Sequence, residues 1–162
     1  MAEKSLLEGK RILAVDDEPD ILETTEALLP MCVVVKASTA DQAKKLMESQ
    51  SFDFAILDIM GVEGYNLLEI AKKKKIIPVM LTAHALSVES TIKSFKGGAA
   101  SYIPKEEMAK IETFLTDILE AEGKGESSWW RWLDRMGDYY KKKFGPEWQK
   151  DEKDFWHNFP AW

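Results

Sequence analysis

The sequence predicts an α/β protein with a doubly wound, five-stranded parallel sheet of (βα)5 type and a short helical extension at the carboxyl end. Three observations carry this prediction. Short apolar, β-forming runs alternate with longer helical patterns, polar residues stand where four of these runs end, and the composition changes sharply near residue 123. Strands that alternate with helices indicate right-handed βαβ units, whose parallel sheet is covered on both faces.

The first two strand and helix pairs have clear boundaries. Arg11–Val15 is an apolar strand, and Pro19 at a first-turn position opens a helix that Pro30 closes after Leu29. Met31–Lys36 is the second strand. Thr39 can cap the following helix, which is expected to run to Ser49.

The remaining elements continue the alternation. Phe54–Leu57 is a buried strand, and a glycine-containing loop leads to a helix at Tyr65–Lys74. Ile76–Leu81 is the fourth strand. The helix Leu86–Phe95 ends at Gly97-Gly98, a plausible C-cap. The last two elements are a strand at Ala100–Ile103 and an amphipathic helix at Lys105–Glu122.

Composition restricts the class of protein. A length of 162 residues allows one domain and a tail, and 45% apolar with 31% charged residues is typical of a globular protein. The net charge of −6 argues against a broadly electrostatic nucleic-acid binder. No segment is apolar enough for a membrane span or a signal peptide. The lone Cys32, interpreted as a small buried hydrophobe, forms no internal disulfide, so a reducing cytoplasmic location is expected.

The chain after residue 122 has a different character. Residues 123–128 are small and polar, which predicts a linker between a domain at 1–122 and an extension at 129–162. That extension holds all six tryptophans and 11 of the 17 aromatic residues. Aromatic residues spaced by three and four predict a helix that Gly145-Pro146 ends. The extension can fold back on its own domain, form a dimer or partner interface, or, least favoured because it is neutral, stack on bases.

Polar side chains follow the strands in an order that suits phosphoryl chemistry. Asp16 and Asp17 follow the first strand, Asp58 the third, Thr82 the fourth and Lys105 the fifth. The carboxyl ends of parallel strands converge on one crevice, so these side chains are expected to share a pocket. Paired carboxylates suit Mg²⁺, and an aspartate can accept a phosphoryl group as an acyl phosphate. Taken singly, each of these residues also has a purely structural explanation. Asp16 and Asp17 can form an acidic turn, and Asp58 can cap a helix. Thr82 can be an ordinary strand-end hydroxyl and Lys105 an ordinary surface lysine.

The order of these motifs resembles the receiver domain of two-component response regulators, a CheY-like, flavodoxin-like fold. The resemblance covers the chain up to about Glu122, roughly three quarters of it, and it implies a cytoplasmic phosphoprotein of a phosphorelay. The strings that carry it are Ile12-Leu13-Ala14-Val15-Asp16-Asp17-Glu18, Leu57-Asp58-Ile59-Met60, Leu81-Thr82-Ala83-His84 and Ala100-Ser101-Tyr102-Ile103-Pro104-Lys105.

The resemblance assigns roles within that crevice. It implies Asp58 as phosphoacceptor, with Mg²⁺ bound directly by Asp17, by Asp16 mostly through water, by Asp58 and by the backbone carbonyl of Met60. Thr82 and Lys105 are implied to bind the phosphoryl group. Tyr102 is implied to be the switch residue, which turns inward when Thr82 moves. Met60 and His84 are expected to affect the lifetime of the phosphoryl group.

Two departures from the family pattern stand out. The loop from Asp58 to Gly64 is about two residues short and lacks the usual proline. Glu106 follows Lys105 where a proline is usual, and Pro104 precedes it. Both changes bear on switching and kinetics, and neither removes a catalytic group.

Three classes of function are compatible with these residues. The favoured one is a phosphorylated switch that accepts its phosphoryl group from a sensor histidine kinase or histidine phosphotransfer protein and acts through a downstream protein partner or a homodimer. It catalyses only its own phosphorylation and dephosphorylation. A phosphorylation-independent adaptor using the aromatic tail is the alternative. A Mg²⁺-dependent phosphatase is the third, although Met60 stands where such enzymes carry a second aspartate.

Overall fold

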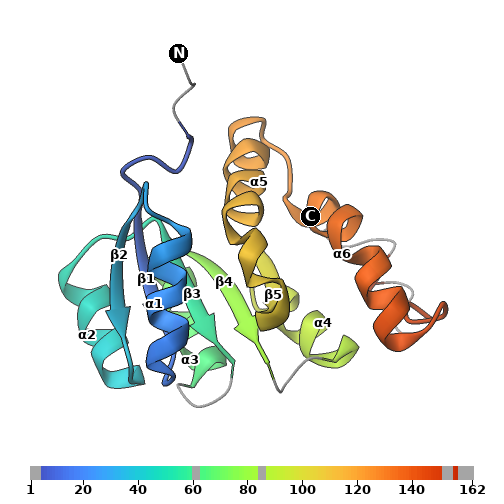
Figure 1. Ribbon diagram of the computed structural model, residues 1–162, viewed down its shortest axis with the longest axis horizontal. Helices are drawn as coiled ribbons and strands as arrows, with labels where there is room; N and C mark the ends of the chain where they lie inside the picture. The colour runs from blue at the N-terminus through green and yellow to red at the C-terminus, as the bar shows by residue number, and fades with distance from the viewer. Residues whose placement is uncertain (1–4, 60–62, 84–86, 151–154, 157–162) are drawn as a thin grey trace.

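A computed structural model describes residues 5–59, 63–83, 87–150 and 155–156. It contains a five-stranded parallel sheet in the order β2-β1-β3-β4-β5, which confirms the doubly wound prediction (Figure 1). The strands are β1 (Arg11–Val15), β2 (Val33–Ala37), β3 (Phe54–Asp58), β4 (Ile77–Thr82) and β5 (Ser101–Pro104). The helices are α1 (Pro19–Leu28), α2 (Ala40–Ser49), α3 (Gly64–Lys73), α4 (Val88–Lys96), the 3₁₀ helix η1 (Lys105–Lys110), α5 (Ile111–Gly123) and α6 (Trp129–Phe144).

Helices cover both faces of the sheet. α1 and α5 lie on one face, and α2, α3 and α4 lie on the other (Figure 1). Every residue of the central strand β3 is buried, as expected for a strand covered on both sides. Among the described residues, no helix is both long and apolar enough to cross a membrane.

Local capping explains where the helices begin. Thr39 accepts a hydrogen bond from the backbone N–H of Gln42 at 3.1 Å, as its expected role as N-cap requires. Ser87 and Ser90 form a reciprocal capping box, so α4 begins at Val88; the expected start at Leu86 lies outside the described residues. Gly98 has a φ of 106°, a conformation that favours glycine at a helix end.

The expected helix Lys105–Glu122 is divided in the structure. It begins as the 3₁₀ helix η1 and becomes α-helical only at Ile111. A 3₁₀ turn is common at the start of an α-helix because its i→i+3 hydrogen bonds tighten the first turn. Here the turn begins at Lys105, whose side chain is held by the carboxylates described below, and it buries Met108.

The backbone at the start of α3 lies very close to the backbone at the end of β3. Glu63 adopts the left-handed conformation with a φ of 54°. A Cβ placed on Gly64 would lie 2.3 Å from the carbonyl oxygen of Asp58 and 2.8 Å from Cα of Ile59. Only glycine fits this approach, so the first turn of α3 lies directly against the backbone of Asp58 and Ile59.

The aromatic extension packs on the domain that precedes it, one of the arrangements the sequence left open. α6 lies beside α4, β5 and α5 at the β5 edge of the sheet (Figure 1). Its buried face consists of Trp129, Trp132, Met136 and Tyr140. The ring of Phe95 on α4 meets the rings of Trp129 and Trp132 edge-on, with centroids 4.7 and 4.9 Å apart.

Polar contacts fix the start and the outer side of α6. The Ser128 hydroxyl donates to the carbonyl of Ala100 at 3.0 Å. On α5, the buried Asp117 pairs with Arg135, and Arg131 binds Glu120 at 2.6 Å. The start of α6 is therefore tied to Ala100, just before β5, and its outer side is tied to α5. The division into 1–122, 123–128 and 129–162 stays a prediction, because these contacts do not define domains.

Trp132→Ala is expected to lower the free energy of unfolding by about 3–5 kcal/mol, because it empties a buried indole site in this aromatic cluster. Trp132 is 2% exposed, whereas Trp130 on the same helix is 53% exposed. Trp130→Ala is the matched control and should change stability by about 0.5 kcal/mol or less. Urea unfolding curves measure both values, and equal losses in the two variants would contradict the packing described here.

Gly64→Ala is expected to cost about 1–3 kcal/mol of stability, because the new methyl group meets backbone atoms that cannot rotate away. A Cβ added at Gly137 on α6 would instead point into open space, with no tertiary neighbour within 4 Å in the part of the chain that the structure describes. Gly137→Ala should therefore stabilise the protein by about 0.5–1 kcal/mol through the helix preference of alanine. Thermal unfolding of the two variants checks the opposite signs.

Candidate functional site

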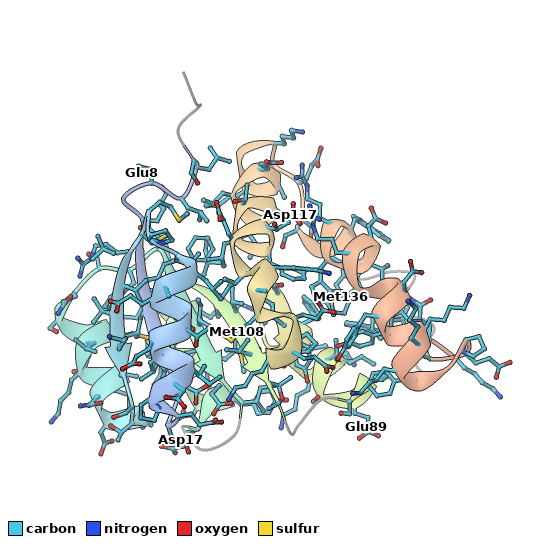
Figure 2. The ribbon with its side chains drawn as sticks, viewed as in Figure 1. Glu8, Asp17, Glu89, Met108, Asp117 and Met136 are labelled. Carbon is cyan, nitrogen blue, oxygen red and sulfur yellow. The ribbon has the colours of Figure 1, made fainter. Side chains whose placement is uncertain are left out.

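The polar residues predicted from the sequence meet at one edge of the sheet. Asp16 follows β1, Asp58 ends β3, Thr82 ends β4 and Lys105 follows β5, and these four strands are neighbours in the order β1-β3-β4-β5. Parallel register aligns their ends, with Asp58 beside Leu81 and Thr82 beside Pro104. Figure 2 shows the labelled Asp17 at this same end of the sheet.

The Lys105 ammonium joins the carboxylates of this crevice. Its Nζ lies 2.9 Å from Asp16 Oδ2, 3.1 Å from Glu18 Oε1 and 3.7 Å from Asp58 Oδ1. The side chains of Asp16, Asp58 and Lys105 are 2%, 6% and 10% exposed, so these charges interact where water screens them little. The shortest of these three contacts is the one to Asp16.

Burial and charge act against each other at this cluster. Burial raises the pKa of Asp16, although the backbone N–H of Glu18 and the Lys105 ammonium both favour the ionised carboxylate. For Lys105, burial alone would lower the pKa of the ammonium. Its hydrogen bonds to Asp16 and Glu18 and its attraction to Asp58 outweigh burial and hold that pKa above its ordinary value. The lysine is therefore firmly cationic.

The acidic end of β1 has the chemistry of a magnesium site. Carboxylate oxygens of Asp16, Asp17 and Glu18 all lie within 4.8 Å of one another. Asp16 Oδ2 is buried and, among the described residues, its one close cationic neighbour is the Lys105 ammonium. A hard divalent cation suits such oxygens, since Mg²⁺ typically takes one or two carboxylates and keeps several waters. Asp17 and Glu18 are exposed and leave room for those waters.

Thr82 and Tyr102 lie behind the crevice. Thr82 is 1% exposed, and interaction with its hydroxyl slightly lowers the pKa of Tyr102. The Tyr102 hydroxyl also lies 2.5 Å from Ser90 Oγ on α4. Burial raises the pKa of Tyr102, and these hydrogen bonds offset part of that rise. The predicted switch residue is thus fully buried and bonded to Ser90 in the first turn of α4.

Two predicted site residues are not among the described residues, and two contacts at the site were not predicted from the sequence. Met60 and His84 lie outside the described residues. Burial raises the pKa of the Cys32 thiol to about 11, as befits an unreactive thiol. The role of Glu18 was missed, although its place directly after the aspartate pair was a usable signal. The contact between Gly64 and the Asp58 carbonyl has no counterpart in sequence pattern, because it joins backbone segments that only the tertiary fold brings together.

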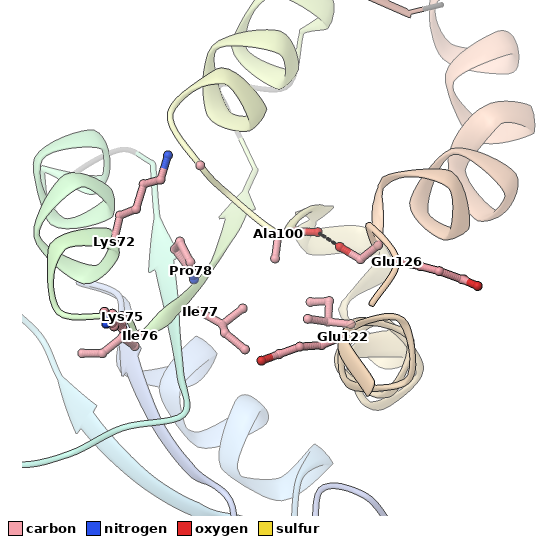
Figure 3. A pocket seen from close by; sticks show the side chains of 11 residues that line it. Lys72, Lys75, Ile76, Ile77, Pro78, Ala100, Glu122 and Glu126 are labelled. Carbon is pink, nitrogen blue, oxygen red and sulfur yellow. Dashed lines mark hydrogen bonds between the residues drawn. The ribbon is translucent and has the colours of Figure 1, made fainter. Parts of the chain in front are cut away.

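A separate hollow lies at the opposite end of the strands. It has a volume of about 320 Å³ and is bounded by Lys72 and Lys75 on one side and by Glu122 and Glu126 on the other (Figure 3). Pro78, near the start of β4, forms part of its wall. None of the crevice residues described above lines this hollow.

The chain is similar to plant response regulators. It is 33% identical over 110 residues to the two-component response regulator ORR25 of Oryza sativa subsp. japonica and 35% identical over 103 residues to ARR18 of Arabidopsis thaliana. These alignments cover 64% and 60% of this chain but only 16% of each plant protein. The similarity therefore concerns one part of much longer proteins.

Solved structures show the same fold. A CheY-like response regulator receiver domain protein from Methanospirillum hungatei JF-1 is 33% identical, with a TM-score of 0.61, over 71% of this chain and 99% of that one. The BeF3-activated receiver domain of Klebsiella pneumoniae RstA is 29% identical, with a TM-score of 0.54, over 59% of this chain and 85% of that one.

The strand ends described above fall within a single family signature. The sequence model of the response regulator receiver domain matches residues 12–116, a stretch that runs from β1 into α5 and contains Asp16, Asp58, Thr82 and Lys105. Together with the parallel sheet and the charged crevice at its edge, that match shows that this chain belongs to the response regulator receiver domain family.

Proposed function

We propose that Asp58 accepts a phosphoryl group from a phosphohistidine donor and that the resulting acyl phosphate switches a protein-interaction surface. The observation that carries the proposal is the Lys105 ammonium, which lies between Asp16 and Asp58 at the edge of the sheet. A cation in this place can neutralise charge on a phosphoryl group arriving at Asp58. The similarity to the BeF3-activated receiver domain of RstA supports the same role.

Each side chain has a distinct part in this proposal. Asp58 is the nucleophile, and its carboxylate oxygen attacks phosphorus while the bond from phosphorus to the histidine nitrogen breaks. Lys105 and Thr82 bind the phosphoryl oxygens, the first by charge and the second by its hydroxyl. Asp17 would hold Mg²⁺ directly and Asp16 mostly through water, and Asp58 and the backbone carbonyl of Met60 would complete the set. When bound, Mg²⁺ neutralises charge on the transferring group.

The partners follow from that chemistry. The donor is a sensor histidine kinase or a histidine phosphotransfer protein, and the protein acts in the cytoplasm as a signalling switch whose only catalysis is on its own aspartate. Output goes to a downstream protein or to a second copy of the chain, without nucleic acid or membrane. We assign residues 1–122 to the receiver, 123–128 to the connection and 129–162 to an extension.

One observation favours a second candidate function. α6 packs on α4 and β5 and places further aromatic surface outside, with Trp130 53% and Phe144 36% exposed. A phosphorylation-independent adaptor would use this extension as its binding face. In that case Asp58→Asn leaves partner binding unchanged, whereas a phosphorylated switch loses the phosphorylation-dependent part of its binding.

Asp58→Asn tests the phosphoacceptor. With Mg²⁺ and a small phosphodonor such as acetyl phosphate, the wild-type chain should gain the mass of one phosphoryl group and Asp58→Asn should gain none. Asp53 is an exposed aspartate just before β3 and makes the matched control, since Asp53→Asn should be phosphorylated like the wild type. Intact-protein mass spectrometry measures all three. Equal mass in the wild type and in Asp58→Asn would contradict the proposal.

Mg²⁺ affinity is expected to fall as the pH is lowered, starting from a higher pH than a free aspartate would give. The pKa of Asp16 is raised in the folded protein, so its carboxyl binds a proton at a pH where an exposed carboxyl remains ionised. Protonated Asp16 contributes stability below that pKa, and the contribution is lost as the pH rises through it. Mg²⁺ compensates for this loss, so its stabilising effect should be larger at about pH 7.5 than at about pH 5.

Thermal unfolding with and without Mg²⁺ across this range checks the expectation. Asp16→Asn serves as the control, because it removes the titrating group and should flatten the pH dependence while weakening the metal effect. A stabilisation by Mg²⁺ that is equally large at both pH values in the wild type would contradict the role of Asp16.

A further inference from the structure

The hollow at the amino ends of β4 and β5 separates positive from negative side chains. Its volume of about 320 Å³ lies at the lower end of the range for small-molecule sites. Lys72 and Lys75, at the carboxyl end of α3, line one wall, and Glu122, in the last turn of α5, lines the other. Apolar side chains make up much of the remaining lining, namely Ile76, Ile77, Pro78, Ala100 and Ile118.

The end of α3 places both ammonium groups of the cationic wall. Lys75 has a left-handed backbone with a φ of 60°. Its N–H donates to the carbonyl of Lys72 at 3.1 Å, and the N–H of Ile76 donates to the carbonyl of Ala71 at 2.9 Å. Glycine is usual at such a helix end, so a lysine is kept here at an energetic cost. The Lys72 side chain lies across Gly98, where an added Cβ would be 2.8 Å from Lys72 Nζ.

The anionic wall faces these lysines without pairing with them. Figure 3 shows the Glu122 side chain extending from α5 toward Ile77. In the described part of the chain, no ion pair joins Glu122 to Lys72 or to Lys75, although an apolar surface lies between them. Opposite charges held apart over an apolar surface are complementary to a molecule that carries both charges itself.

We propose that this hollow binds a small zwitterion with an apolar body, the chemistry of a free amino acid such as leucine. The carboxylate of the ligand would lie against Lys72 and Lys75, and its ammonium group against Glu122. Charge-assisted hydrogen bonds orient such a ligand, and contact of its side chain with the apolar lining adds affinity. The hollow lies at the other end of the strands from Asp58, so binding does not require phosphorylation.

The same hollow reaches the connection that leads to α6. Glu126 and Ser128 line it, and the Ser128 hydroxyl donates to the carbonyl of Ala100 at 3.0 Å. Ser128 directly precedes α6. A ligand in the hollow would contact α3 and this connection together, and a ligand that binds only one arrangement of a protein stabilises that arrangement. The site therefore gives a small molecule a means to stabilise the docked extension.

Amide NMR spectra of the full chain, recorded during titration with L-leucine, test the proposal. A ligand of about ten heavy atoms in an open hollow should bind with a Kd on the order of 1 mM. The backbone signals of Gly98, Ala100 and Ser128 should shift together and saturate. Two analogues keep the apolar body and one charge each: 4-methylpentanoate lacks the ammonium group, and 3-methylbutylamine lacks the carboxylate. Each should bind roughly tenfold more weakly than leucine, because one charged wall is left without a partner.

Exchange of the lysines tests the cationic wall. The double variant Lys72→Gln with Lys75→Gln should weaken leucine binding roughly tenfold, since it removes both cations that meet the carboxylate. Lys73→Gln with Lys74→Gln is the matched control and should bind leucine like the wild type. It removes the same charge from the same run of lysines, but neither residue lines the hollow, and Lys73 lies 3.5 Å from Glu69 instead. All four lysines are exposed, so both double variants keep the fold.

Exchange of the glutamate tests the opposite wall. Glu122→Gln should weaken the binding of leucine by a similar factor, since it removes the partner of the ammonium group. Glu112→Gln is its control, because Glu112 is an exposed residue in the first turn of the same helix and does not line the hollow. The affinity of Glu112→Gln for leucine should equal that of the wild type.

Three results would overturn the proposal. One is the absence of saturable shifts at Gly98, Ala100 and Ser128 with leucine. Another is equal affinity for leucine and for either analogue, since one charge would then suffice. The third is equal weakening by the two pairs of lysine exchanges, which would show general attraction to a positive surface and no defined site.

Discussion

The contact of the Lys105 ammonium with the carboxylates of β1 and β3 is the interaction on which the rest of the site depends. Asp16 and Asp58 end adjacent parallel strands, and both are buried. Two such anions repel each other and lose hydration, a cost that only a well-placed cation can offset. Lys105, which directly follows the edge strand β5, supplies that cation. The order of the strands therefore determines which charges meet in the crevice.

That arrangement leaves the site poised for a second cation and an anion. Burial raises the pKa of Asp16 even with Lys105 beside it, which means that the ammonium alone does not fully compensate this carboxylate. A divalent ion beside Asp16 and Asp17 would relieve the remaining cost. A phosphoryl group on Asp58 would then meet positive charge on both sides. The buried carboxylates thus lower the stability of the ligand-free fold, and a bound cation would restore it, as is common at binding sites.

Much of this could be predicted from sequence because the signals are local. Apolar runs, first-turn prolines and capping residues such as Thr39 determine the strands and helices, and strand ends of a parallel sheet always converge. The divided helix after Lys105 was not predicted, because amphipathic spacing does not distinguish a 3₁₀ turn from an α-helical one. The Gly64 approach and the Thr91–Tyr140 contact were also missed, since they join residues brought together only by tertiary packing.

The aromatic extension shows why those tertiary contacts matter for function. A face built from Phe95, Trp129 and Trp132 would be stable with apolar contacts alone, and hydrophobic packing does not need hydroxyl groups. Yet Thr91 and Tyr140 place a hydrogen bond in its interior, where a mispaired group is costly. Such a bond makes the packing depend on geometry as well as on area. Because Trp132 of the same helix donates to the carbonyl oxygen of Tyr102, this geometry ties the extension to β5, the strand that leads into Lys105.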